Sequence, residues 1–180
     1  RTQITETLDL IDAEPCCNVL KAVGTPDELD LLTVQQNVKI LKEWARKESA
    51  ELVYDSATCD FSHDAFNACL QSPNNAVIGV TEDGDVYGGF VSVAVKETDV
   101  YTPDPGHFIF SLFSHRRCAV PQRWAIKPEK QKTAVKIFET GCSSFIRFGG
   151  ATFEGRLYFG NGQEESFCCK LREIFSGVED

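Results

Sequence analysis

Ala76-Val-Ile-Gly-Val80, Thr81-Glu-Asp-Gly-Asp85 and Val86-Tyr-Gly-Gly-Phe-Val-Ser-Val-Ala-Val95 follow one another directly, and this stretch decides the fold. The first and third segments are apolar runs, and the second is a short acidic segment that contains a glycine. Two apolar runs joined in this way are typical of a β-hairpin, because glycine and aspartate tolerate the backbone angles that reverse the chain. We therefore predict an antiparallel hairpin from residue 76 to residue 95.

Further strands are expected on both sides of this hairpin. Glu51–Tyr54 precedes it as a short strand, and a helix capped by Ser62 is expected to run to Leu70. After the hairpin, short apolar or alternating segments recur between turn residues, at 107–113, 123–126, 134–139, 143–148 and 155–159. Many short strands separated by turns are typical of an antiparallel sheet protein.

A longer helix is expected before this β-rich region. Thr25-Pro-Asp-Glu28 supplies an N-cap hydroxyl, a proline at the first helical position and a glutamate three residues after the cap, and we predict a helix to about Lys47. Its apolar stripe fits either packing on a domain or a short coiled coil with a second copy of the chain: Leu31, Val34, Val38, Leu41 and Ala45. No element is predicted before it, so the expected organisation is an N-terminal extension (1–24), a helical segment (25–48) and a domain (49–180).

Length and composition favour one domain with an extension. The chain has 180 residues, of which 42% are hydrophobic and 25% charged, as in ordinary globular proteins. No apolar run approaches the roughly 20 residues that span a bilayer, and no leader precedes a cleavage site. We expect a cytoplasmic protein without a membrane segment, or alternatively a nuclear one. Because the chain begins with Arg1 and contains no methionine, we also expect flanking sequence to be missing.

The eight cysteines do not follow a zinc-binding pattern, since none of them forms a CxxC pair. In a chain of this size without a secretory leader, we expect most of them to be reduced thiols that fill apolar space. Cys168 and Cys169 are the exception. Neighbours in a strand point to opposite faces, so one of the two is expected to be exposed, and we single out this pair as a redox-sensitive candidate.

The formal net charge of −9 disfavours a general electrostatic grip on nucleic acid. Between Gly106 and Arg147, however, eight basic residues stand against two acidic ones, a local charge of +6 that leaves −15 for the remainder. The candidates for contact with a protein partner or with nucleic acid are Arg116, Arg117, Arg123, Lys127, Lys130, Lys132 and Lys136. No helix-turn-helix or zinc-finger pattern accompanies them. The stretch fits a face for an acidic protein, a nucleic-acid surface or ordinary solvated surface.

Residues of catalytic type do not form a recognisable site in the sequence. His115 and Cys118 lie close together, but no aspartate or asparagine is placed to orient the histidine. The acidic residues around Gly84 are too closely spaced for a calcium-binding EF-hand loop, and the glycine pairs lack the spacing of a phosphate-binding loop. We therefore expect no catalytic residues, no cofactor and no metal ion.

From about Ile40 to Gly177 the chain resembles the TLDc domain family, the module of oxidation-resistance proteins. The matching segments come in the family's order: Leu52-Val-Tyr-Asp-Ser56 with Asp60-Phe-Ser62, Ala76-Val-Ile-Gly-Val80 with Val86-Tyr-Gly-Gly-Phe90, His107-Phe-Ile-Phe-Ser-Leu112, Ile146-Arg-Phe-Gly-Gly150 and Ser166-Phe-Cys168. The most specific single match is the segment that begins at His107. The family's closing aromatic-rich strand has no counterpart before Asp180, so we expect the last strand of the domain to be absent or divergent.

The resemblance implies an α+β, mainly β fold in which two antiparallel sheets form a sandwich flanked by helices. It also implies a non-catalytic protein-interaction module. In that family the contacts include the vacuolar proton pump, and the physiological theme is protection against oxidative stress. The alternative function, which uses the basic stretch 116–136, is a DNA-binding regulator of the stress response.

Overall fold

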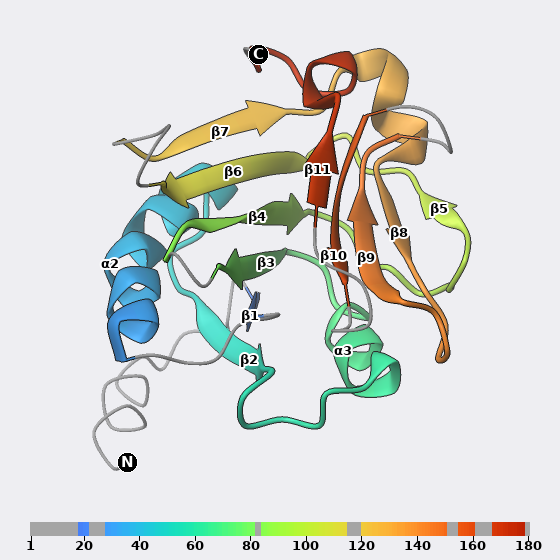
Figure 1. Cartoon of the computed structure of the whole chain (residues 1–180). Helices are drawn as coiled ribbons and strands as arrows, with labels where there is room; N and C mark the ends of the chain where they lie inside the picture. The colour runs from blue at the N-terminus through green and yellow to red at the C-terminus, as the bar shows by residue number, and fades with distance from the viewer. Residues whose placement is uncertain are drawn as a thin grey trace.

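The computed structural model describes residues 18–21, 28–81, 84–114, 120–150, 155–160 and 167–178, which form two β-sheets with strands that run crosswise to each other (Figure 1). The six-stranded sheet has the order β2 (Glu51–Asp55), β1 (Asn18–Lys21), β3 (Asn75–Val80), β4 (Val86–Val91), β6 (Phe108–Phe113), β7 (Gln122–Ala125). The five-stranded sheet has the order β11 (Phe167–Cys169), β10 (Arg156–Gly160), β9 (Ser144–Phe148), β8 (Val135–Ile137), β5 (Tyr101–Thr102). The predicted mainly β sandwich is confirmed.

The hairpin predicted from residues 76–95 lies in the middle of the six-stranded sheet. Its strands β3 and β4 pair antiparallel, with Ala76 opposite Phe90 and Val80 opposite Val86. Strand β4 ends at Val91, earlier than predicted. The next backbone amide, that of Ser92, donates to the Asp104 carboxylate at 2.7 Å, so it leaves the ladder of strand hydrogen bonds.

Two glycines of this hairpin allow the second sheet to approach closely. A Cβ added at Gly79 would overlap the ring of Phe159, and one added at Gly89 would lie 2.8 Å from the ring of Phe148. Both rings come from the five-stranded sheet, on β10 and β9. Because these two glycines have no side chains, the two phenyl rings can occupy the space next to them.

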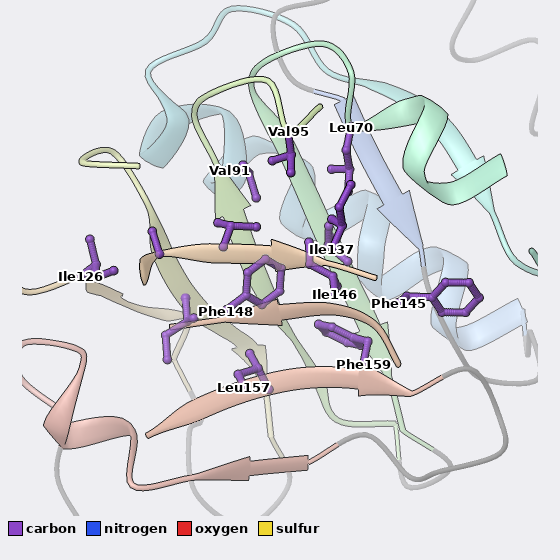
Figure 2. Close-up of a cluster of buried hydrophobic side chains, with 14 of the residues drawn as sticks. Leu70, Val91, Val95, Ile126, Ile137, Phe145, Ile146, Phe148, Leu157 and Phe159 are labelled. Atoms are coloured by element: carbon purple, nitrogen blue, oxygen red, sulfur yellow. The ribbon is translucent and has the colours of Figure 1, made fainter. Parts of the chain in front are cut away.

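The core has two layers, one on each face of the six-stranded sheet. Between the two sheets lies an aromatic-rich cluster in which Phe148 and Phe159 are fully buried, and Figure 2 shows several of its side chains. On the opposite face, a second cluster includes Ala76 and Ile78 from β3 together with Leu41. The alternation of inward and outward side chains along β3 supplies both layers, because successive residues of a strand point to opposite faces.

Helix α2 (Glu28–Ala45) covers the outer face of the six-stranded sheet (Figure 1). Its bounds lie inside the predicted helix, whose expected cap at Thr25 falls outside the described residues. Leu41 is buried and Val38 and Ala45 pack against the same cluster. Of the two roles considered for the stripe, packing on the domain is thus confirmed for these three side chains. Pairing with a second copy stays a prediction.

Strand β1 was missed by the sequence analysis, which predicted no element in residues 1–24. It lies between β2 and β3 and runs parallel to both, with Asn18 opposite Glu51 on one side and Asn75 on the other. Four residues carry too short a pattern to identify a strand. Parallel pairing also needs no adjacent turn, so no local signal marks it. Part of the expected extension therefore belongs to the sheet.

Helix α3 (His63–Cys69) follows the predicted pattern in detail. The Ser62 hydroxyl accepts a hydrogen bond from the Ala65 amide at 3.3 Å, so Ser62 is the cap as predicted. The helix ends with Leu70, which is fully buried in the cluster between the sheets. The expected strands after the hairpin appear as β6 to β10, displaced at their ends by a few residues at most.

After β11, the described chain forms a short 3-10 helix, η2 (Leu171–Glu173), and then returns to the six-stranded sheet. Phe175 forms an antiparallel bridge with Ile126, and the Ser176 amide donates to Ala125 O at 2.9 Å. Ile174 and Phe175 are buried in the aromatic cluster. This segment therefore closes the end of the core through two side chains and a single bridge.

Replacing Gly79 with alanine should destabilise the fold, because the new methyl group would overlap the ring of Phe159. We expect a loss of about 1–3 kcal/mol in the free energy of unfolding, the usual cost of overpacking a core. Urea denaturation of Gly79→Ala, Phe159→Leu and the double variant tests this. In the double variant the smaller side chain makes room for the methyl group, so its loss should be smaller than the sum of the single losses. Additive losses would contradict the proposed overlap.

Candidate interaction surface

The basic residues predicted as a binding stretch lie on three different elements. Arg116 and Arg117 fall outside the described residues. Arg123 lies on β7 of the six-stranded sheet and Lys136 on β8 of the five-stranded sheet. Between them, Lys127 precedes the 3-10 helix η1 (Pro128–Thr133), which carries the remaining two, Lys130 and Lys132. Neighbours along the chain are thus divided between the two sheets and their connection.

Arg123 connects β7 to helix α2. Its Nη1 donates to Trp44 O at 2.8 Å, and its guanidinium carbon lies 6.0 Å from the Trp44 ring and 5.4 Å from the Phe108 ring. Trp44 belongs to the last turn of α2, where carbonyl oxygens lack partners within the helix and the helix dipole favours a cation. This arginine therefore holds the helix end against the edge strand.

Lys127 makes a comparable internal contact at the end of the sandwich. Its Nζ donates to Arg172 O of η2 at 2.7 Å, and its amide donates to Ile174 O at 2.9 Å. The lysine ties the start of η1 to the C-terminal segment, which packs into the core. Its ammonium group is thus already engaged with the backbone.

Lys136 belongs to a row of side chains across the five-stranded sheet. The register places Tyr101 of β5 opposite Lys136, Lys136 opposite Arg147 of β9, and Arg147 opposite Tyr158 of β10. The row lies on the outer face, because the neighbouring Val135, Ile137, Ile146 and Phe148 point into the core. We name these four residues the cation row: Tyr101, Lys136, Arg147 and Tyr158.

The ring of Phe138 lies close to both cations of this row. Lys136 Nζ lies 4.9 Å and the Arg147 guanidinium carbon 5.3 Å from the centre of the Phe138 ring, within the range of cation–π attraction. Lys136 also pairs with Asp99 at 3.0 Å. Arg147 Nη1 donates to the Tyr101 hydroxyl at 3.2 Å, and that hydroxyl donates to Gly150 O at 2.6 Å. Arg147 was counted in the basic stretch but not singled out, and only the cross-strand register reveals its position beside Lys136.

The described cysteines differ in their degree of exposure. On β11, Cys168 is exposed and Cys169 is half-buried, as predicted for neighbours in a strand. The redox sensitivity of this pair stays a prediction. Cys59 is also exposed, so neither it nor Cys168 fills apolar space as expected for most cysteines. Burial, with a smaller contribution from Cys59, raises the pKa of the Cys69 thiol and disfavours its reactive thiolate form.

Ser92, Asp104 and His107 lie close together but do not form a nucleophilic site. The Ser92 hydroxyl donates to the Asp104 carboxylate, which also accepts from the Gly106 amide at 2.9 Å. His107 Nδ1 bonds to Phe90 O at 2.6 Å and therefore carries the proton, while the buried Nε2 has no partner. The serine thus bonds to the carboxylate, and the histidine points into the core. His115 and Cys118 lie outside the described residues.

Within the described part of the chain, no group of three or more histidine, cysteine or acidic side chains is arranged to hold a metal ion. In the same residues, no helix is both long and apolar enough to cross a membrane.

The fold and its outer surface define a mainly β sandwich with a cationic and aromatic row on one sheet. The family model of the TLDc domain matches residues 28–176, more than half of the chain, and the chain therefore belongs to the TLDc family. This family is generally linked to oxidative-stress resistance. The matched range includes helix α2, which the sequence analysis had placed before the domain. A search of curated proteins finds no match.

Changing Arg123 to methionine should loosen α2 from the sheet, because the hydrogen bond to Trp44 O and the charge at the helix end are lost while most of the aliphatic stem remains. We expect the free energy of unfolding to fall by about 1 kcal/mol. Urea denaturation checks this, with Lys132→Met on η1 as the control that removes the same charge from an exposed position. Equal effects of the two changes would contradict a specific role for Arg123.

The stability of the fold should fall in mild acid because of His107. Burial lowers the pKa of this side chain to about 4 from its ordinary value of 6.5, against the opposing effects of the Phe90 carbonyl and Asp104. Between these two pH values the unfolded chain binds a proton that the folded chain does not, so the stabilisation is complete above pH 6.5 and is lost as the pH falls towards 4. The expected loss is on the order of 3 kcal/mol.

Urea denaturation at about pH 7.5 and about pH 5 measures this effect, of which about 2 kcal/mol should already be lost at pH 5. His107→Asn is the control, since its amide can donate to Phe90 O without titrating. We expect the variant to be less stable at neutral pH but to lose less stability on acidification. An equal loss in the two proteins would show that other groups cause the acid sensitivity.

Proposed function

We propose that the chain is a protein-interaction module that acts without catalysis. The observation that carries this proposal is that Asp104 and the two described histidines serve the fold. Asp104 is fully buried and holds the turn after β5 against Ser92, and His107 lies between the rings of Phe148 and Phe175. His63, the other described histidine, is buried and bonds to Ser144 O at 3.0 Å.

Membership of the TLDc family supports a role in protection against oxidative stress. The resemblance to that family makes the vacuolar proton pump the first partner to test, since contacts with this pump occur in the family. Surface residues such as the cation row offer charge and aromatic area at once. Both features favour contacts with proteins, because arginine and tyrosine contribute strongly to protein interfaces.

The DNA-binding alternative is less well supported. A duplex presents regularly spaced phosphates to one continuous surface, whereas the described basic residues of the stretch lie on separate elements. Three of these residues already make contacts within the chain. Arg123 and Lys127 each donate to a backbone carbonyl oxygen, and Lys136 pairs with a carboxylate. A duplex would have to displace these internal contacts as well as overcome the net charge of −9.

Binding of the whole chain to the purified peripheral sector of a vacuolar proton pump, and separately to duplex DNA, tests the proposal. We expect the pump sector to bind, and the duplex to bind weakly at a physiological ionic strength of roughly 0.15 M. Cross-linking followed by mass spectrometry would map the contact. If the pump sector does not bind, this partner is excluded. Binding of a different protein would still support the function as a protein-interaction module.

Tight duplex binding would overturn the proposal in favour of the DNA-binding alternative. In that case log affinity should fall linearly with log salt, and neutralising Arg123 and Lys136 together should make the slope shallower by about two units. Lys39→Met with Lys96→Met is the matched control, because it removes two exposed charges outside the basic stretch.

A further inference from the structure

The cation row contains an arrangement that is unfavourable in the isolated chain. Lys136 and Arg147 lie directly opposite each other on adjacent antiparallel strands. Like charges in this position destabilise the pairing of two strands, since both side chains project from the same face of the sheet and lie close together. A partner that brings negative charge to this face would relieve the repulsion.

Among the residues that the structure describes, a carboxylate compensates only one of the two cations. Asp99 pairs with Lys136 at 3.0 Å. Arg147 donates a side-chain hydrogen bond to the neutral hydroxyl of Tyr101, and its Nε is buried without an acceptor. Among the described residues of the row, therefore, two cations share one carboxylate, and Arg147 is the side chain whose charge is not matched.

The surroundings of the row determine the shape of a suitable ligand. The buried Phe138 ring lies against both cations, and the side chain of Lys136 is 18% exposed, so only a small part of this charge is open to a ligand. A slender group such as a carboxylate side chain fits this site better than a duplex.

We propose that the cation row forms the docking surface for an extended acidic segment of a protein partner, with a carboxylate held between Lys136 and Arg147. This inference rests on the proposed function as a protein-interaction module and names the surface that it uses. The carboxylate accepts hydrogen bonds from the two cations. The edge strand β5 pairs with β8 at this end of the row, where an extended chain can follow it.

Asp99 is the internal competitor for this site, because it occupies one of the two cations. Its backbone has φ +61°, a conformation that asparagine adopts readily, so Asp99→Asn should preserve the loop. The substitution frees Lys136 for the incoming carboxylate. A gain in affinity from removing a charge is a result that loss of folding cannot produce.

The test uses the full chain labelled with ¹⁵N and a fluorescein-labelled peptide in which glutamate and serine alternate around a central valine. Its matched peptide carries glutamine in place of glutamate. We expect the glutamate peptide to bind, to shift the amide signals of β8 and β9, and to bind about tenfold more weakly to Lys136→Met or to Arg147→Gln. Asp99→Asn should bind about threefold more tightly, and the matched change Lys132→Met should leave the affinity unchanged.

Several results would overturn the inference. Equal binding of the glutamine peptide would show that the carboxylate has no role. An equal loss of affinity in Lys132→Met would show that the effect comes from the net charge alone. Duplex DNA that binds to β8 and β9 more tightly than the peptide, with a steep dependence on salt, would assign the row to nucleic acid. Self-association in sedimentation that Lys136→Met abolishes would assign it to a second copy of the chain.

The same variants separate this inference from the proposed function. If a protein partner binds the unmodified chain and the Lys136→Met and Arg147→Gln variants equally well, the interaction module stands and the docking surface is wrong. If the acidic peptide binds at the row but protein partners bind nowhere, the surface stands as an anion site and the module is wrong. Circular dichroism of each variant confirms that the fold is retained.

Discussion

The close approach of two phenyl rings to two glycines is the constraint on which the rest of the structure depends. Gly79 and Gly89 leave the central hairpin without side chains where Phe159 and Phe148 enter from the other sheet. The rings take the volume that two side chains would fill, so the sheets meet at one distance and in one orientation. His107 depends on the same contact, because its ring stacks on Phe148 with the centroids 5.2 Å apart and thereby remains dry and uncharged.

The two sheets pack through their inner faces, and their outer faces have different roles. Helix α2 covers the outer face of the six-stranded sheet, and Arg123 secures the end of the helix. The outer face of the five-stranded sheet instead carries the cation row, where the Phe138 ring lies close to both cations. A charged row buried under a helix would lose its hydration at high cost. Interaction with a partner is therefore expected on the five-stranded sheet, and stability is supplied on the other side.

Most local elements were predictable because their signals lie within a few neighbouring residues. The Ser62 cap, the hairpin from β3 to β4 and the apolar runs of β6 to β10 all depend on short-range backbone preferences and alternation. Strand β1 was missed because its partners, β2 and β3, are distant in sequence and parallel to it. The arrangement of the basic stretch was not predictable for a related reason. Its described residues pass from one sheet to the other between Arg123 and Lys136, so their placement on separate elements depends on how the two sheets pack.

The sequence by itself determined the mainly β class, the positions of most strands and the membership of the TLDc family, since ordered motifs and local propensities carry that information. Only the tertiary structure decided that Lys136 and Arg147 face each other between Tyr101 and Tyr158. It alone also decided that Ser92, Asp104 and His107 meet without forming a reactive set. The physical reason is that strand register and the packing of two sheets place side chains by contacts between distant segments, and no local pattern in the chain encodes those contacts.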